Sequence, residues 1–186
     1  MAAINLAGPL VGYSVSLSRR GQFLAAGDCG ADATWLYSKA SGQWKRKPFP
    51  YVRVSSPSPS CQNGTTFQTV ALSGGGTRLV TGIDGARHVA YIYDRPSNGW
   101  HSSTTPSAIL TIPVSRYKSD GPSITPQFSI SDSGATIIAG GVLLERVLIY
   151  RNVLAVTARR SVSRGSEPGK PQARTAVSQV PSVRCL

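Results

Sequence analysis

Residues 12–27 read GYSVSLSRRGQFLAAG, and the same pattern returns as FQTVALSGGGTRLVTG at residues 67–82 and as PQFSISDSGATIIAGG at residues 126–141. Each copy contains a serine, a first glycine and a second glycine at matching places: Ser18, Ser73 and Ser131; Gly21, Gly76 and Gly134; Gly27, Gly82 and Gly140. These landmarks recur at intervals of 55 and 58 residues. Because separate landmarks keep one spacing, the chain contains three copies of one structural unit.

Within each copy, the residue pattern predicts short strands joined by tight turns. Alternating apolar residues such as Val15 and Leu17 predict a first strand, and the serine, glycine and aspartate residues after it predict a hairpin turn. Short apolar runs then predict a second strand that is covered on both faces, at residues 23–27, 79–82 and 137–140.

Aromatic motifs place the remaining strands. WLY at residues 35–37, YIY at 91–93 and LIY at 148–150 predict the third strand. In the first two copies a turn followed by Trp44 or Trp100 predicts the start of a fourth strand, whereas the third copy stops before this point. Four antiparallel strands in about 55 residues are the content of one propeller blade. The sequence therefore predicts an all-β fold, a partial β-propeller of about three four-stranded antiparallel blades.

The unit GYSVSLSRRGQFLAAG, followed by WLY and SGQW, resembles the FG-GAP repeats of integrin alpha subunits and of many bacterial and protist surface proteins. The resemblance covers about residues 12–151, although the leading Phe-Gly of the family motif is only approximated. It implies a propeller, usually of seven blades, whose loops contact proteins or ligands and often hold calcium. The corresponding loops here are residues 28–33, 83–87 and 141–145. The candidate interaction residues in these loops are Asp28, Asp32, Asp84, Arg87 and Glu145.

Calcium takes about six to eight oxygen ligands, which an acidic alternation such as DxDxDG supplies. The first loop offers only Asp28 and Asp32, the second offers Asp84, and the third offers Glu145. We therefore expect neither calcium nor another cofactor.

The composition favours one domain rich in turns. The chain has 186 residues, of which 40% are hydrophobic and 15% charged, with 19 glycines and 13 prolines, which excludes helical bundles and coiled coils. No apolar run approaches the ~20 residues that span a bilayer, and the first residues lack the basic start of a secretory signal. The expected location is cytoplasmic by default, or extracellular if the chain is a fragment of a secreted protein.

Positive charge dominates the sequence. Twenty Lys and Arg residues against eight Asp and Glu give a net charge of +12, which favours polyanionic partners. The candidate basic patch consists of Lys45, Arg46 and Lys47 in the repeat array and Arg159 and Arg160 behind it. Residues 152–186 lack the strand pattern and predict a disordered basic tail. The predicted repeat array covers residues 1–151, with repeats at about 11–56, 66–117 and 126–151.

Cys29, Cys61 and Cys185 are odd in number and show no CxxC spacing, so they predict three free thiols and no zinc site. A disulfide between Cys29 and Cys61 would require an oxidising compartment.

No pattern typical of an enzyme is present. Neither His88 nor His101 has an acid or a cysteine at a spacing that would orient it as a base, and the chain has no GxSxG or phosphate-binding loop. We interpret the SGGG of residues 73–76 as a hairpin turn rather than an anion-binding nest. The recurring aromatic residues are interpreted as packing residues first and as carbohydrate or base platforms second: Trp35, Trp44, Trp100, Tyr37, Tyr93 and Tyr150.

Three blades leave two apolar flanks without a neighbour, because each propeller blade packs between two others. The chain is then a fragment of a longer propeller, which we favour, a unit that closes a ring by self-association through its flanks, or an array capped by its tail. The expected function is a non-catalytic protein-interaction module with an unknown protein partner. The alternative is binding of a polyanion, RNA or an acidic glycan, through the basic patches and the tail.

Overall fold

The computed structural model describes residues 11–39, 42–44, 52–55, 68–83, 89–112, 126–141, 147–151 and 183–185. These residues form three four-stranded antiparallel sheets in which strands adjacent in sequence are also neighbours in space. The first sheet contains β1 (Val11–Leu17), β2 (Phe23–Asp28), β3 (Ala33–Ser38) and β4 (Val52–Ser55). The second contains β5 (Gln68–Leu72), β6 (Arg78–Ile83), β7 (Val89–Asp94) and β8 (Ala108–Thr111). The third contains β9 (Gln127–Ile130), β10 (Thr136–Gly140), β11 (Leu148–Arg151) and β12 (Val183–Cys185).

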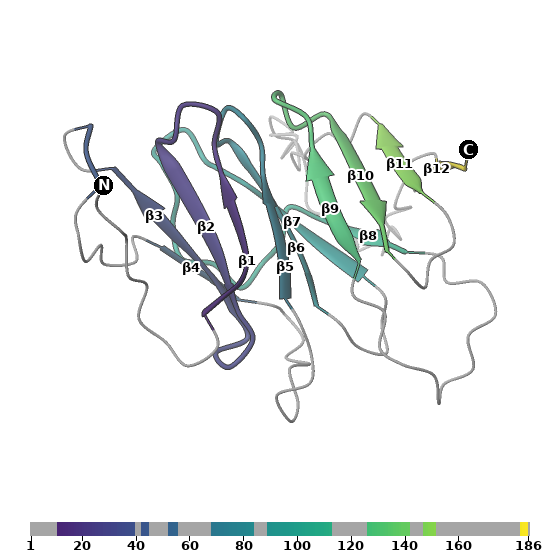
Figure 1. The fold of residues 1–186 in the computed structure, drawn as a ribbon, viewed down its shortest axis with the longest axis horizontal. Helices are drawn as coiled ribbons and strands as arrows, with labels where there is room; N and C mark the ends of the chain where they lie inside the picture. The colour runs from purple at the N-terminus through teal and green to yellow at the C-terminus, as the bar shows by residue number, and fades with distance from the viewer. Residues whose placement is uncertain are drawn as a thin grey trace, which may run out of the picture.

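The three sheets stand next to one another in chain order (Figure 1). The first strands meet, because β1 contacts β5 and β5 contacts β9. The prediction of an all-β partial propeller of about three four-stranded antiparallel blades is thus confirmed. Among the described residues there is no helix with the length and hydropathy needed to cross a membrane.

The fourth strands begin later than the sequence analysis predicts. β4 and β8 each start eight residues after the tryptophan of their copy, Trp44 or Trp100. Trp100 is buried, and its indole Nε1 donates a hydrogen bond of 3.1 Å to the carbonyl oxygen of Gly76. The side chain therefore packs under the hairpin turn of its own sheet instead of starting a strand.

The third sheet has a fourth strand that the sequence analysis missed. β12 lies within residues 152–186, for which the sequence predicts disorder, and it pairs antiparallel with β11 so that Cys185 lies opposite Leu148. No turn and tryptophan precede it, so no local pattern marks these residues as a strand. The remainder of the predicted tail, residues 152–182, lies outside the described residues.

Each sheet has two faces, which we name by the neighbour that they meet. The leading face of a sheet looks toward the sheet before it in the chain, and the trailing face looks toward the sheet after it. A first core joins the trailing face of the first sheet, including Ala25 and Leu36, to the leading face of the second, including Leu79 and Tyr93. A second core joins the trailing face of the second sheet to the leading face of the third, where Tyr150 is buried. The middle sheet is therefore covered on both sides, and every residue of β5 is buried.

A buried polar network joins the first two sheets. The Gln68 side chain is 1% exposed. Its Oε1 accepts a hydrogen bond of 3.1 Å from the Asp28 backbone N–H. Its Nε2 donates to the hydroxyls of Thr34 and Thr81 at 2.9 and 3.0 Å, and these hydroxyls are themselves 3.1 Å apart. The network satisfies polar groups that would otherwise be buried without partners, so it also fixes how the sheets align.

Two tyrosines at matching repeat positions tie each sheet to the one before it. The Tyr93 hydroxyl donates to the carbonyl oxygen of Ser55, the last residue of β4, at 2.8 Å. The Tyr150 hydroxyl donates to the carbonyl oxygen of Thr111, the last residue of β8, at 2.9 Å. These contacts agree with the interpretation of the recurring tyrosines as packing residues.

Tyr93 should make the stability of the fold decrease at alkaline pH. Burial, with a smaller contribution from Tyr91, raises the pKa of the Tyr93 phenol above its ordinary value. The unfolded chain releases this proton near about pH 10, whereas the folded chain keeps it to higher pH. The contribution to stability is therefore complete below about pH 10 and is lost as the pH rises further, by about 1.4 kcal/mol at one pH unit above the unfolded pKa.

Urea unfolding measured between pH 9 and pH 11 tests this expectation. Y93F should show a smaller decrease in unfolding free energy than the wild type over this interval. As the control, the difference in unfolding free energy between the wild type and Y93F should stay constant between about pH 6 and pH 8, where the phenol is protonated in both the folded and the unfolded chain. A Y93F curve as steep as that of the wild type would assign the alkaline loss to other groups.

Candidate functional site: the turn face

The three hairpin turns between the first and second strands are built in the same way. In each turn a serine hydroxyl accepts a hydrogen bond of 3.0 Å from the backbone N–H five residues later: Ser18 from Phe23, Ser73 from Arg78 and Ser131 from Thr136. A glycine with positive φ follows each serine, at +60° in Gly21, +65° in Gly76 and +78° in Gly134. Glycine adopts this conformation without steric cost, which explains the glycine in each repeat. The SGGG segment is thus a hairpin turn, as interpreted from the sequence.

The three turns touch one another at one end of the sheets, which is the upper end in Figure 1. The Arg19 backbone N–H donates to the Gly74 carbonyl oxygen at 3.0 Å, and the Gly75 N–H donates to the Asp132 carbonyl oxygen at 3.1 Å. The Arg78 guanidinium also donates to the Gly134 carbonyl oxygen at 2.8 Å. These bonds link the turns of all three sheets into one continuous surface, which we call the turn face.

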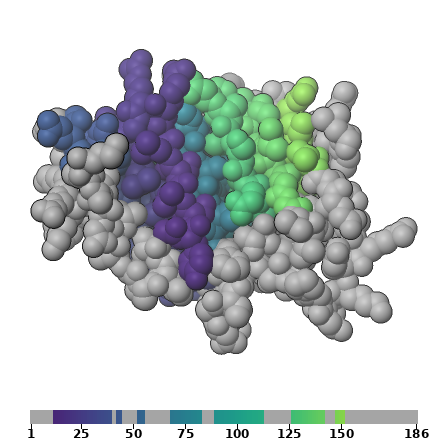
Figure 2. Space-filling model, viewed as in Figure 1, coloured from purple at the N-terminus to yellow at the C-terminus, as the bar shows by residue number. Residues whose placement is uncertain are grey.

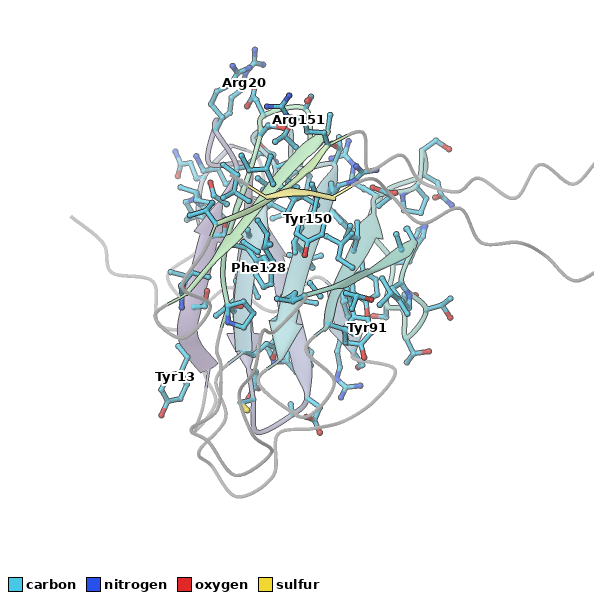
Figure 3. The ribbon with its side chains drawn as sticks, turned by 90° about the vertical axis from the view of Figure 1, so that its right-hand side faces the viewer. Tyr13, Arg20, Tyr91, Phe128, Tyr150 and Arg151 are labelled. Carbon is cyan, nitrogen blue, oxygen red and sulfur yellow. The ribbon has the colours of Figure 1, made fainter. Side chains whose placement is uncertain are left out.

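Cationic side chains gather on the turn face. Because the sheets are antiparallel meanders, the residues that follow β3, β7 and β11 return to the end where the hairpin turns lie. The turn face therefore carries Arg19, Arg20, Lys39, Arg78, Arg95 and Arg151, together with the carboxylates of Asp94 and Asp132. Figure 3 shows Arg20 and Arg151 at the same end of the molecule, with Tyr13 at the opposite end.

The two carboxylates are already paired. Asp94 accepts from the Arg78 guanidinium at 2.5 and 3.1 Å, and Asp132 lies 2.9 Å from the Arg19 guanidinium. Arg20, Lys39, Arg95 and Arg151 have no carboxylate partner among the described residues. The Arg95 guanidinium lies over the Phe23 ring, 5.1 Å from its centroid, and this contact holds it at the surface. The turn face therefore has an excess of positive charge, which attracts acidic groups.

Most of this surface was not predicted from the sequence, although a periodic signal is present. A cation occurs within two residues of the tyrosine that ends the third-strand motif in every copy: Lys39, Arg95 and Arg151. The predicted basic patch lies elsewhere, because Lys45, Arg46, Lys47, Arg159 and Arg160 are all outside the described residues.

The first predicted interaction loop, residues 28–33, lies at the end of the sheets opposite the turn face, and residues 84–87 and 142–145 of the other two loops lie outside the described residues. Asp28 in this loop is 6% exposed. Its two carboxylate oxygens accept hydrogen bonds from the Trp35 indole at 2.9 Å and from the Ala31 N–H at 3.2 Å. Asp28 therefore shapes the loop from inside, while Asp32 is half-buried with a φ of +46°. Asp84, Arg87 and Glu145 lie outside the described residues.

Other expected sites have simple structural roles. His101 is exposed and lies 2.8 Å from the Asn98 side-chain oxygen, while His88 lies outside the described residues. No group of three metal-ligating side chains occurs in the part of the chain that the structure describes. Tyr37, Tyr93, Tyr150 and Trp100 are buried, and Trp35 and Trp44 are half-buried.

Cys29 corrects an expectation from the sequence. It is buried and disulfide-bonded, whereas the spacing of the cysteines predicts free thiols. The partner cysteine is not among the described side chains, so the pairing with Cys61 stays a prediction.

The array is similar to β-propellers of known structure. The Dos1 propeller matches with a TM-score of 0.51 at 12% identity, over 81% of this chain and 33% of that one. The complex of KlAtg21 with the coiled coil of AgAtg16 matches with a TM-score of 0.50 at 12% identity, over 76% of this chain and 37% of that one. A putative 6-phosphogluconolactonase from Bacteroides uniformis matches with a TM-score of 0.50 at 13% identity, over 74% of this chain and 35% of that one.

These similarities, together with the three sheets, define the chain as a set of β-propeller blades. It spans about a third of the length of the propellers that it matches. No family model and no curated protein sequence matches the chain. The similarities extend to the propeller fold and do not single out the FG-GAP type of repeat.

Proposed function

We propose that this chain is a non-catalytic propeller module that binds an acidic segment of a partner protein through the turn face. The observation that carries the proposal is the group of four cations, Arg20, Lys39, Arg95 and Arg151, on a surface whose carboxylates are both paired. The hydrogen bonds between the turns hold the backbone of this surface in place, so little order has to be gained on binding. The repeat motif supports assigning the blades to the FG-GAP type, whose propellers contact proteins or ligands through their loops.

The aromatic side chains near the turn face favour an acidic protein over a single-stranded nucleic acid. Proteins that bind unpaired bases usually stack them on exposed aromatic rings. Here Tyr37, Tyr93 and Trp100 are buried, and Arg95 covers the Phe23 ring. One of the similar propellers was solved in complex with a coiled coil, which shows that a propeller of this architecture can bind a protein segment.

An enzymatic function receives little support. One similar propeller is a putative lactonase, but at 13% identity the likeness concerns the fold alone. On the described turn face the only acids are Asp94 and Asp132, and both are held by arginines.

Binding of a labelled oligoglutamate peptide, followed by fluorescence anisotropy, tests the proposal. We expect the double variant R20E/R151E to raise Kd roughly tenfold at low salt, because each reversal replaces an attraction by a repulsion. The wild-type affinity should fall as salt is added. R53E is the control matched in charge to each single variant, R20E or R151E, because Arg53 lies away from the turn face, where its guanidinium donates to the Ala31 carbonyl oxygen at 2.8 Å. Its Kd should change less than about twofold.

Two results would contradict the proposal. An R53E variant that weakens binding as much as R20E alone or R151E alone would show that net charge, and not the turn face, attracts the peptide. Single-stranded RNA that binds much more tightly than the peptide would favour the polyanion alternative.

A further inference from the structure

The leading face of the first sheet exposes apolar residues that are buried at the same position in the next sheet. Val70 and Leu72 of β5 are each 5% exposed, because they pack against the trailing face of the first sheet. Their repeat equivalents on β1, Val15 and Leu17, are 57% and 54% exposed. Residues of one type at one repeat position thus differ only in whether another sheet precedes them.

The trailing face of the third sheet shows the same contrast. Val80 and Ala90 on the trailing face of the second sheet are fully buried against the third sheet. Their equivalents in the third sheet, Ile138 and Val147, are 39% and 49% exposed. Figure 2 shows the first sheet (purple) and the third sheet (green) at the surface, with the second sheet (teal) visible only between them.

The space beside the second glycine of each repeat depends on whether another sheet follows. A Cβ on Gly27 would lie 2.7 Å from the Gln68 carbonyl oxygen of the second sheet, and a Cβ on Gly82 would overlap the Phe128 ring of the third sheet. A Cβ on Gly140 would meet nothing within 4 Å. The third sheet thus keeps a residue suited to close approach, although none of the residues that the structure describes approaches it.

Polar side chains on the first strands also differ between the internal junctions and the open faces. The Ser14 and Ser16 hydroxyls of β1 accept hydrogen bonds from the backbone N–H groups of Val70 and Leu72 at 3.0 and 2.9 Å. Ser129 of β9 occupies the repeat position of Ser16 and is exposed. It is placed to accept from a further first strand in the way that Ser16 accepts from β5.

We propose that the trailing face of the third sheet docks on the leading face of the first sheet of a second copy of this chain. Two such junctions would join two copies head to tail into a closed ring of six blades. The internal junctions point to a second copy as the occupant, because the two open faces belong to one chain and each matches a face that is paired within it. Such heterologous contacts form a ring when the rotation closes.

The contact is centred on the inner strands. Ala26 and Tyr37, also on the leading face of the first sheet, are already buried within the chain, so the open part of that face is β1. Ser129 matches Ser16, which accepts from the Leu72 N–H, so it would accept from the N–H of Leu17 of the second copy. Gly140 matches Gly27, which lies beside Gln68, so it would lie against Tyr13 of the second copy.

Light-scattering mass after gel filtration tests the proposal with the chain as it is. The expected mass is twice the chain mass of 19.6 kDa. V15D and I138K should each give a monomer that keeps the far-ultraviolet circular dichroism of the wild type, because both positions are exposed within the chain. The matched control is I109K on the outer strand β8, where Ile109 is 54% exposed but belongs to neither open face, and it should stay a dimer.

Mixing the variants separates a head-to-tail contact from a face-to-face one. V15D keeps an intact trailing face and I138K keeps an intact leading face, so their mixture should form a one-to-one dimer although each alone is a monomer. A monomeric wild type, an assembly larger than two copies, a dimer that survives I138K, or a mixture that stays monomeric would each overturn the proposal.

Discussion

Replacing Gly27 with alanine is expected to lower the free energy of unfolding by about 2–3 kcal/mol, which corresponds to a fall of roughly 5–10 °C in Tm. The new Cβ would lie 2.7 Å from the Gln68 carbonyl oxygen. This oxygen cannot turn away, because Gln68 is held in β5 by its pairing with Ile83 of β6. The first two sheets must therefore move apart, which loosens the core between them. Urea unfolding followed by circular dichroism measures the loss.

The repeat provides a matched control for this substitution. Gly140 occupies the same repeat position, and a Cβ there meets nothing within 4 Å. In a V15D background, where self-association is not expected to contribute, G140A should change the unfolding free energy by less than about 0.5 kcal/mol. Equal losses for G27A and G140A would show that alanine is unfavourable at this strand position itself, and that close approach of the next sheet is not the cause.

Replacing Gln68 with leucine is expected to destabilise the protein by about 2–3 kcal/mol, although leucine is of similar size and more apolar. The Asp28 N–H would lose its acceptor inside the molecule, where water cannot replace it. Among the described residues, the hydroxyls of Thr34 and Thr81 would keep only their mutual contact at 3.1 Å. Thermal or urea unfolding measures the effect.

Q22L serves as the control for this second substitution. The Gln22 side chain is exposed and makes one long contact, 3.4 Å from its Nε2 to the Lys39 carbonyl oxygen. Water can replace this contact, so the change in stability should stay within about 0.5 kcal/mol. If Q68L were as stable as Q22L, the polar network would not contribute to the junction between the sheets.

The sequence predicted the features whose causes are local. A hairpin turn depends on a few consecutive residues, so the repeated serine and glycine marked all three turns, and alternating apolar residues marked the strands beside them. The interval between copies then predicted the number of blades. The same regularity predicted that the end blades would present apolar faces, which the exposure of Val15 and Ile138 confirms.

Features that depend on contacts between distant segments could not be predicted in this way. β12 is a strand because the edge of β11 lies beside it, and its own sequence carries no strand signal. Gln68 became a buried junction residue because folding brings Asp28, Thr34 and Thr81 around it from three other strands.

The turn face also combines a feature that the sequence determines with one that depends on tertiary contacts. A cation follows the third-strand motif in every copy, and the sequence alone determined that spacing. Only the tertiary structure decided that Arg20, Lys39, Arg95 and Arg151 share one surface, and that Asp94 and Asp132 are paired with other arginines. The sequence alone determined the blade as a local unit, because turns and strands follow from neighbouring residues. The packing of the blades decided which charges remain available to a partner, because that depends on which turns meet.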